Sequence, residues 1–223
     1  MADYILERRC RSMYDEIRVL THSSIKISGT STIYVDPFKI KDALTDADII
    51  LITHEHYDHF SPEDIKKVQN GSTVFVAPQS MIGKLEDAGI ESEFIEYVEP
   101  GDELEISGVT IKAVPAYNVL KNFHPKKNCW VGYLVTMNGI SCYVAGDTDI
   151  NEDVEKVCCD VALLPCGGTY TMDVREAALL AEIIKPKLAI PTHYGNVAGD
   201  PEDGDRFVEL LKGKVKAEIR MEY

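Results

Sequence analysis

Three histidines and an aspartate crowd into one short stretch of the chain. Residues 53–59 read Thr-His-Glu-His-Tyr-Asp-His and hold half of the six histidines in the protein. Neutral imidazole and carboxylate are the ligands that divalent metals such as Zn²⁺ prefer. The alternating spacing of His54 and His56 points both rings the same way from an extended segment, whereas Asp58 and His59 face elsewhere on the turn. The stretch therefore predicts metal ligands, and it suits two adjacent ions better than one.

Two further candidates follow apolar runs elsewhere in the chain. Asp147 comes just after the run at 141–145, and His193 comes just after the run at 187–192. Side chains at the ends of strands gather at one rim of a layered α/β protein, so both residues can converge on the histidine-rich stretch. Each residue alone is weak evidence. Their joint occurrence after that stretch favours their being ligands.

Two weaker candidates would lie on the same rim. His22 follows an apolar run at 17–21, so it could contact substrate or support the metal ligands. A purely structural role, as a histidine held in a local turn, is nearly as good an interpretation. The pair Gly167-Gly168 could present backbone N–H groups to an anion or simply form a turn.

The elements that must position these residues are short strands and helices. Runs rich in Val, Ile and Tyr predict strands at 17–21, 32–36, 49–53, 73–77, 109–114, 131–137, 140–145, 161–164, 188–192 and 215–221. Asn138-Gly139 predicts a two-residue hairpin turn. Capping residues, prolines and apolar spacing predict helices at 61–70, 78–89, 151–158, 173–185 and 206–212. Strand, turn and helix recur in both halves, so we expect two similar layers packed face to face in a single α/β domain over residues 1–223.

The composition limits the partners of the protein. The formal net charge of −14 repels nucleic acid and anionic lipid surfaces, so we expect neither as a partner. A small, anionic substrate remains open because a metal cluster is a local concentration of positive charge. Residues 1–11 lack the apolar core of a secretory signal, and no run reaches the ~18 apolar residues of a membrane span. We therefore expect a cytoplasmic protein, with homo-oligomerisation left open.

The order of these motifs resembles the metallo-β-lactamase superfamily across almost the whole chain. The motifs are H-x-H-x-D-H at 54–59, Gly-Asp-Thr at 146–148 and the late His193. Segments 22–24 and 189–195 are similar to the branch that contains L-ascorbate-6-phosphate lactonase. The resemblance implies a four-layer αββα sandwich with a dinuclear site, holding two Zn²⁺ ions or Mn²⁺ in their place. It implies that His54 and His56 bind the first metal, that Asp58, His59 and His193 bind the second, and that Asp147 bridges them.

One position departs from the branch. Its members usually place a third histidine for the first metal just after a Pro-Ala step, whereas this chain has Asn118 there. The amide oxygen of Asn118 could coordinate, His124 could reach in from the same loop, or the first site could be weak or empty. His124 could equally be a solvated loop histidine.

These residues together predict a hydrolase. Two cations ~3.5–4 Å apart can share a metal-bound hydroxide that attacks a polarised carbonyl or phosphoryl group. Asp58 would hold one metal and orient the hydroxide, with His22 assisting. We expect a small ester or lactone substrate, or a phosphoester such as a phosphodiester. One alternative is a metal-binding module without turnover, which the asparagine at position 118 makes credible. The other is an iron protein that passes electrons through flavin. His56 argues against this second alternative, because such a protein would be expected to have a carboxylate at that position.

Overall fold

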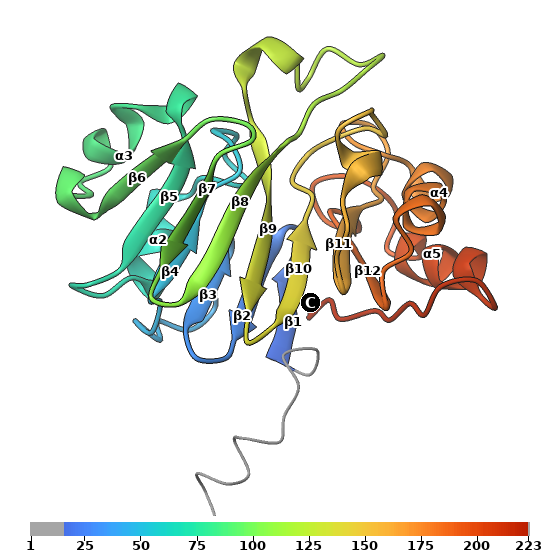
Figure 1. Cartoon of the computed structure of the whole chain (residues 1–223), viewed down its shortest axis with the longest axis horizontal. Coiled ribbons are helices and arrows are strands. Elements are labelled where there is room, and N and C mark those ends of the chain that lie inside the picture. The colour runs from blue at the N-terminus through green and yellow to red at the C-terminus, as the bar shows by residue number, and fades with distance from the viewer. Residues whose placement is uncertain (1–15, 223) are drawn as a thin grey trace, which may run out of the picture.

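Two six-stranded sheets form the centre of the protein. The structure is a computed structural model and describes residues 16–222, so the expectation for residues 1–11 lies outside it (Figure 1). The first half of the chain forms one sheet, with its strands in sequence order: β1 (Ile17–Thr21), β2 (Ser24–Ser28), β3 (Thr32–Val35), β4 (Ile49–Leu51), β5 (Val74–Pro78) and β6 (Ile95–Val98). The second half forms the other in the same manner: β7 (Glu103–Ile106), β8 (Val109–Pro115), β9 (Val131–Met137), β10 (Ile140–Val144), β11 (Val161–Pro165) and β12 (Leu188–Thr192).

The strand directions bring several strand ends to one edge. In the first sheet β1, β2 and β3 are antiparallel, and β3 to β6 are parallel. In the second, β7 to β10 are antiparallel, and β10, β11 and β12 are parallel. It follows that β1 runs the same way as β4, and β8 the same way as β10 and β12. The loops after these five strands carry all the candidate site residues except Gly167 and Gly168, which follow β11.

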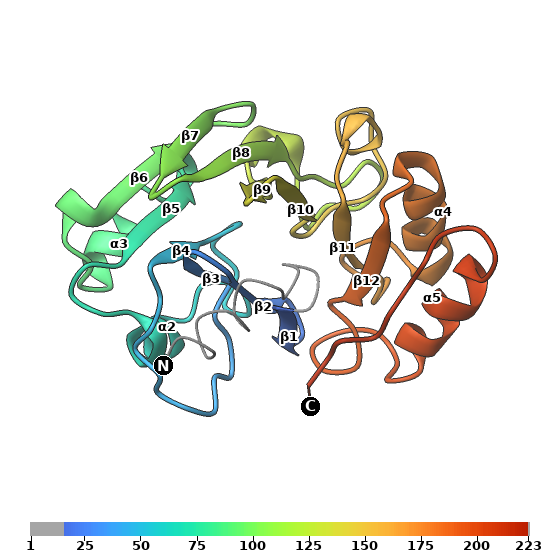
Figure 2. The ribbon, with the colours of Figure 1, turned by 60° about the horizontal axis from the view of Figure 1, so that its bottom comes forward.

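Helices cover the outer faces of the two sheets. Figure 2 shows α2 (Pro62–Val68) and α3 (Lys84–Asp87) on the flank of the first sheet, and α4 (Val174–Ile184) and α5 (Asp203–Leu211) on the flank of the second. Short 3₁₀ turns complete the described elements: η2 (Gln79–Met81), η3 (Ser92–Phe94), η4 (Lys126–Asn128) and η5 (Val154–Lys156). The order helix, sheet, sheet, helix confirms the predicted four-layer sandwich.

Apolar side chains fill the layers on both sides of the first sheet. Ile49 and Leu51 of β4 lie in the buried cluster between the two sheets, together with Tyr143 of β10. Ile50, between them in sequence, belongs to the cluster with Ile65 of α2. A strand buried on both faces needs apolar residues at every position, which explains why the run before the histidine-rich stretch is unbroken.

Several local predictions are confirmed. Ser61 caps α2 by accepting from the backbone N–H of Asp64, and Asp173 caps α4 in the same way. Asn138 and Gly139 both have positive φ, 54° and 75°, as the two-residue hairpin between β9 and β10 requires.

Two predicted helices are wrong. The segment 78–89 is not continuous, because Pro78 ends β5 and Gly83, at φ 84°, separates η2 from the single turn of α3. A left-handed residue cannot continue an α-helix. In the segment 151–158 only η5 is helical.

The predicted last strand, 215–221, is split between the two sheets. Ala217 forms an isolated bridge to Ala189 of β12, and Met221 forms one to Val19 of β1. One short segment cannot pair fully with edge strands of two different sheets, so no continuous ladder forms. The segment instead straps the two edge strands together.

Strands β2, β6 and β7 were not predicted. Each mixes charged or hydroxyl side chains with its apolar residues, as in Glu-Leu-Glu-Ile of β7.

Among residues 16–222, no helix combines the length and the apolar character that crossing a bilayer requires.

Candidate metal centre

All six histidines of the chain meet at the edge where the five loops converge. Their nitrogens, with carboxylate oxygens of Asp58 and Asp147, form groups in which the atoms lie within 4.8 Å of one another. One group is His54, His56 and His124; a second is His22, Asp58, His59 and His193; a third is His54, His59 and Asp147. The structure thus brings together every histidine and both aspartates singled out in the sequence.

The first group is a set of three imidazoles. His54 Nε2 lies 3.0 Å from His56 Nδ1, and His124 Nε2 lies 3.2 Å from the same His56 atom. Burial lowers the pKa of His54 well below its ordinary value and also lowers that of His56. Three ring nitrogens this close together, on imidazoles that burial keeps neutral in the case of His54 and His56, are a donor set that a divalent cation can take.

The second group surrounds the carboxylate of Asp58. Its Oδ2 lies 3.2 Å from His22 Nε2, 3.6 Å from His59 Nε2 and 3.7 Å from His193 Nε2. Burial opposes ionisation of Asp58, but the hydrogen bond from His22 and the charge of His59 lower its pKa to about 2. Burial lowers the pKa of His22 to about 4. His22 is therefore a neutral donor to an ionised Asp58.

Asp147 lies between the two groups. Its Oδ2 is 3.1 Å from His193 Nε2 and 3.2 Å from His124 Nε2, and its Oδ1 is 3.3 Å from His59 Nε2. Burial opposes ionisation, but the nearby His193 and His59 hold the pKa of Asp147 well below its usual range. A carboxylate in contact with both groups can be shared by two ions.

The donor set fits a divalent metal. Three buried atoms that face the cluster, His59 Nε2, His193 Nε2 and Asp147 Oδ1, have charged or polar neighbours at 3.1–3.3 Å, but within the described part of the chain none of them makes a contact with hydrogen-bond geometry. Leaving a buried polar atom unpaired costs about 1–3 kcal/mol, and native structures rarely leave several together. Cations coordinated here would give these atoms partners.

A buried aspartate that sequence reasoning missed supports the second group. Asp36 Oδ2 lies 2.6 Å from His59 Nδ1, and Asp36 also accepts hydrogen bonds from the Thr53 backbone and hydroxyl, at 2.8 Å and 2.6 Å. Burial lowers the pKa of His59, but the carboxylates of Asp147 and Asp36 raise it well above its ordinary value. A carboxylate behind a ligating histidine fixes its orientation and its tautomer. Asp36 ends an apolar run, the same signal that pointed to Asp147.

The only tryptophan of the chain was also missed. Trp130 is buried, and its ring centroid lies 4.9 Å from those of His54 and His56 and 5.4 Å from that of His124. It covers one side of the first group and excludes water there. No spacing rule links it to the histidine-rich stretch, because it reaches the group from the loop after β8.

Asn118 lies beside the first group, in contact with His124. Its amide oxygen lies 3.2 Å from His124 Nδ1, and its amide nitrogen donates to the Tyr170 carbonyl at 2.9 Å. Both ends of the amide are engaged within the protein. Of the open alternatives for this position, the geometry places His124, not Asn118, with His54 and His56.

The glycine pair forms a tight packing point and a turn. Gly168 N–H donates to the Met172 carbonyl at 3.0 Å, so it is not available to an anion. A methyl group at Gly167 would lie 2.1 Å from the His193 carbonyl oxygen. His193 itself has a positive φ of 54° and donates its backbone N–H to the His22 carbonyl. Gly167 therefore lets the backbone at His193 take up this position.

We expect Gly167→Ala to lower the free energy of unfolding by about 1–3 kcal/mol, because the methyl group must displace backbone rather than a flexible side chain. Urea denaturation measures the change. Gly71→Ala is the matched control, since nothing lies within 4 Å of its added carbon, and it should shift stability by less than about 0.5 kcal/mol. Equal effects of the two substitutions would contradict the packing role of Gly167.

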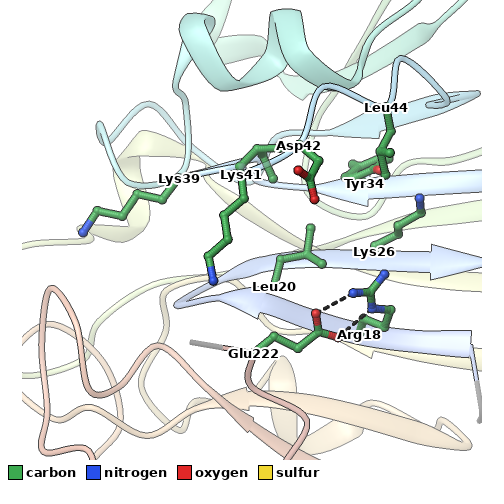
Figure 3. A pocket seen from close by; sticks show the side chains of 10 residues that line it. Arg18, Leu20, Lys26, Tyr34, Lys39, Lys41, Asp42, Leu44 and Glu222 are labelled. Carbon is green, nitrogen blue, oxygen red and sulfur yellow. Dashed lines mark hydrogen bonds and ion pairs between the residues drawn. The ribbon is translucent and has the colours of Figure 1, made fainter.

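A second concave region lies on the outer side of the first sheet. Figure 3 shows it between β1, β2, β3 and the segment after β3, lined by Arg18, Leu20, Lys26, Tyr34, Lys39, Ile40, Lys41, Asp42, Leu44 and Glu222. Arg18 pairs with Glu222, and Lys26 with Asp46 at 2.6 Å, while Lys39 donates to Asn196. Since these cations are engaged by the protein's own side chains, we assign no ligand to this region.

Comparisons with known proteins agree with this architecture. A family model described as a beta-lactamase superfamily domain matches residues 16–193. A protein of Pyrococcus furiosus named as a metal-dependent hydrolase is 32% identical over 222 residues, covering 92% of this chain and 95% of the relative. The crystal structure of a proposed metal-dependent hydrolase from Parabacteroides distasonis is 33% identical with a TM-score of 0.79, covering 92% of this chain and 91% of that one. The match over most of the chain confirms the resemblance at the level of the superfamily, and the chain belongs to the metallo-β-lactamase superfamily.

Proposed function

We propose that this protein is a metal-dependent hydrolase with a dinuclear centre. His54, His56 and His124 would hold the first ion, Asp58, His59 and His193 would hold the second, and Asp147 would be shared. The proposal rests on one observation above all, the gathering of all six histidines with two carboxylates into overlapping groups at one edge of the sandwich. The names of the relatives from Pyrococcus furiosus and Parabacteroides distasonis support it.

The chemistry follows from this donor set. Two bound divalent ions, Zn²⁺ or in its place Mn²⁺, would acidify water and polarise a substrate oxygen. Asp58 Oδ2, ionised and central in its group, can accept a hydrogen bond from the attacking water and so orient it. His22 donates to that carboxylate and holds it in place. Trp130 keeps solvent away from the side of the first group.

We further propose a small, dissolved substrate with a scissile carbonyl or phosphoryl group, used in the cytoplasm. The positive charge of two divalent ions would exceed the negative charge of Asp58 and Asp147, so a negative group on the substrate would be attracted in spite of the net charge of −14. A lactone or another ester is the first class to test, because segments 22–24 and 189–195 resemble the lactonase branch. A phosphoester is the second.

Metal content is the direct test of the centre. We expect about two divalent ions per chain in the purified protein, measured by mass spectrometry of the metals. His193→Ala and Asp58→Ala should each lose about one ion, because each removes a ligand of the second group only. Asp42→Ala, on an exposed side chain away from the cluster, is the control and should keep both. Full metal content in the two ligand variants would remove the assignment.

Turnover is tested on the same preparations. The metal-loaded protein should hydrolyse at least one member of a panel of lactones, carboxylic esters and phosphodiesters, and removal of the metals by a chelator should abolish this until metal is restored. Trp130 offers a second readout, because metal binding to the three histidines beside it should change its fluorescence. Tight metal binding without hydrolysis of any panel member would favour a binding module over an enzyme.

A further inference from the structure

The loop after β8 carries His124 into the first group. Asn118 begins it, and the two residues are joined by three contacts. Asn118 N–H donates to the His124 carbonyl at 2.7 Å, His124 N–H donates to Asn118 Oδ1 at 2.9 Å, and His124 Nδ1 lies 3.2 Å from the same oxygen. Both residues are buried, at 6% and 1% exposure. The contacts close the loop into a ring that ends at the histidine.

The orientation of the Asn118 amide is determined by its other partner. Asn118 Nδ2 lies 2.9 Å from the Tyr170 carbonyl oxygen, which can only accept a hydrogen bond. The NH₂ group must therefore face Tyr170, and the amide oxygen must face His124. The backbone N–H of His124 can only donate a hydrogen bond, so it also requires the amide oxygen of Asn118 to face His124.

This orientation selects the tautomer of His124. Because Asn118 Oδ1 can only accept, its contact with His124 is a hydrogen bond only when Nδ1 carries a proton and donates it to that oxygen. With the Nδ1 proton held by Asn118, Nε2 is the ring nitrogen left for a metal, and it lies 3.2 Å from His56 Nδ1 and 3.2 Å from Asp147 Oδ2. The ring thus presents an acceptor atom, the form that binds a metal, to the first group.

The loop is also anchored to the segment after β10. Val119 N–H donates to Asp149 Oδ2 at 3.0 Å, and Lys121 Nζ pairs with Asp149 Oδ1 at 2.6 Å. Asp149 lies two residues after Asp147, so the loop that supplies His124 is tied to the segment that supplies the shared carboxylate. These contacts restrict where the ring can lie, whereas the hydrogen bond to its Nδ1 comes, among residues 16–222, from Asn118.

We propose that Asn118 is a positioning residue, which holds His124 in the Nδ1–H tautomer with Nε2 directed at the first metal. The inference rests on the dinuclear centre proposed above. It replaces the idea that Asn118 is itself a ligand, because both ends of its amide are used within the protein.

The first test uses Zn²⁺ affinity, measured by competition with a chromophoric chelator. Asn118→Ala should weaken the first ion by about 10–100-fold, the range typical of groups behind a ligand. Asn118→Asp keeps the acceptor oxygen for His124 but loses the donor to Tyr170, so it should restore part of the affinity. Asn122→Ala, an exposed asparagine on the same loop, should leave it unchanged. Unchanged Zn²⁺ affinity in Asn118→Ala would overturn the proposal.

The second test reads the tautomer without any metal. Long-range ¹H–¹⁵N spectra of the metal-free full chain should show His124 with a protonated Nδ1 in the wild type and in Asn122→Ala, and a shift toward Nε2–H in Asn118→Ala. The Nε2–H tautomer in the metal-free wild-type protein would overturn the inference whatever the metal does. If the wild type binds no Zn²⁺, the proposed centre fails instead, and this is seen before any variant is compared.

Discussion

Asp147→Asn is expected to leave the protein with one bound ion or fewer and to lower hydrolysis by more than about 100-fold. Supporting groups behind a ligand typically cost 10–100-fold, and Asp147 is a stronger case because it contacts histidines of both groups directly. The asparagine has nearly the same shape but no charge, so it cannot be shared by two cations as a carboxylate can. Metal analysis and turnover with the best panel substrate measure the two effects.

Asp153→Asn is the matched control for this substitution. Asp153 lies in the same loop, contacts the Tyr117 hydroxyl at 3.0 Å and belongs to none of the groups of possible ligands. It should retain both ions and nearly full activity. If Asp147→Asn behaved like this control, the idea of a shared carboxylate would be lost.

Asp36→Asn should weaken the second ion by about 10–100-fold and lower the free energy of unfolding by about 3–5 kcal/mol, the cost of breaking a buried ion pair. Asp36 is 1% exposed and accepts three hydrogen bonds, one of them from His59. Its φ is 47°, a value that asparagine also tolerates, so the loss would come from the charge and the acceptor rather than from backbone strain.

Denaturation and Zn²⁺ competition measure these changes, with Asp48→Asn as the control. Asp48 also accepts a backbone hydrogen bond, from Thr32 at 2.7 Å, but it does so at an exposed position. Its substitution should change stability by less than about 0.5 kcal/mol. Wild-type Zn²⁺ affinity in Asp36→Asn would show that His59 needs no carboxylate behind it.

The parts of the site that follow strand ends could be predicted from the sequence. His193 comes directly after its strand, and His54 and Asp147 come three residues after theirs; parallel strands carry such residues to one edge. The choice between Asn118 and His124 could not be made, because it depends on how the loop after β8 folds. Loop conformation is set by contacts distant in sequence, here with Asp149 and Tyr170.

The fold was predictable where the pattern of side chains was unambiguous. Strands buried on both faces, such as β4 and β11, stand out as continuous apolar runs. Strand β7 at the sheet edge carries exposed glutamates and resembles a polar loop. The segment 78–89 contains helix-forming residues, but a single left-handed glycine interrupts it, and the sequence does not distinguish a glycine of this kind from one that a helix tolerates.

Each of the two groups of proposed ligands contains residues from both halves of the chain, so metal binding should stabilise the folded protein. His54 and His56 come from the first half and His124 from the second, and His193 joins His22, Asp58 and His59 in the same way. Each ion would act as a cross-link between the two sheets, beside the strap at 215–221. Binding restricted to the folded state adds about 2.7 kcal/mol at a free metal concentration one hundred times Kd. Resistance to heat would then vary with the supply of metal, so that the amount of folded protein itself reports metal availability.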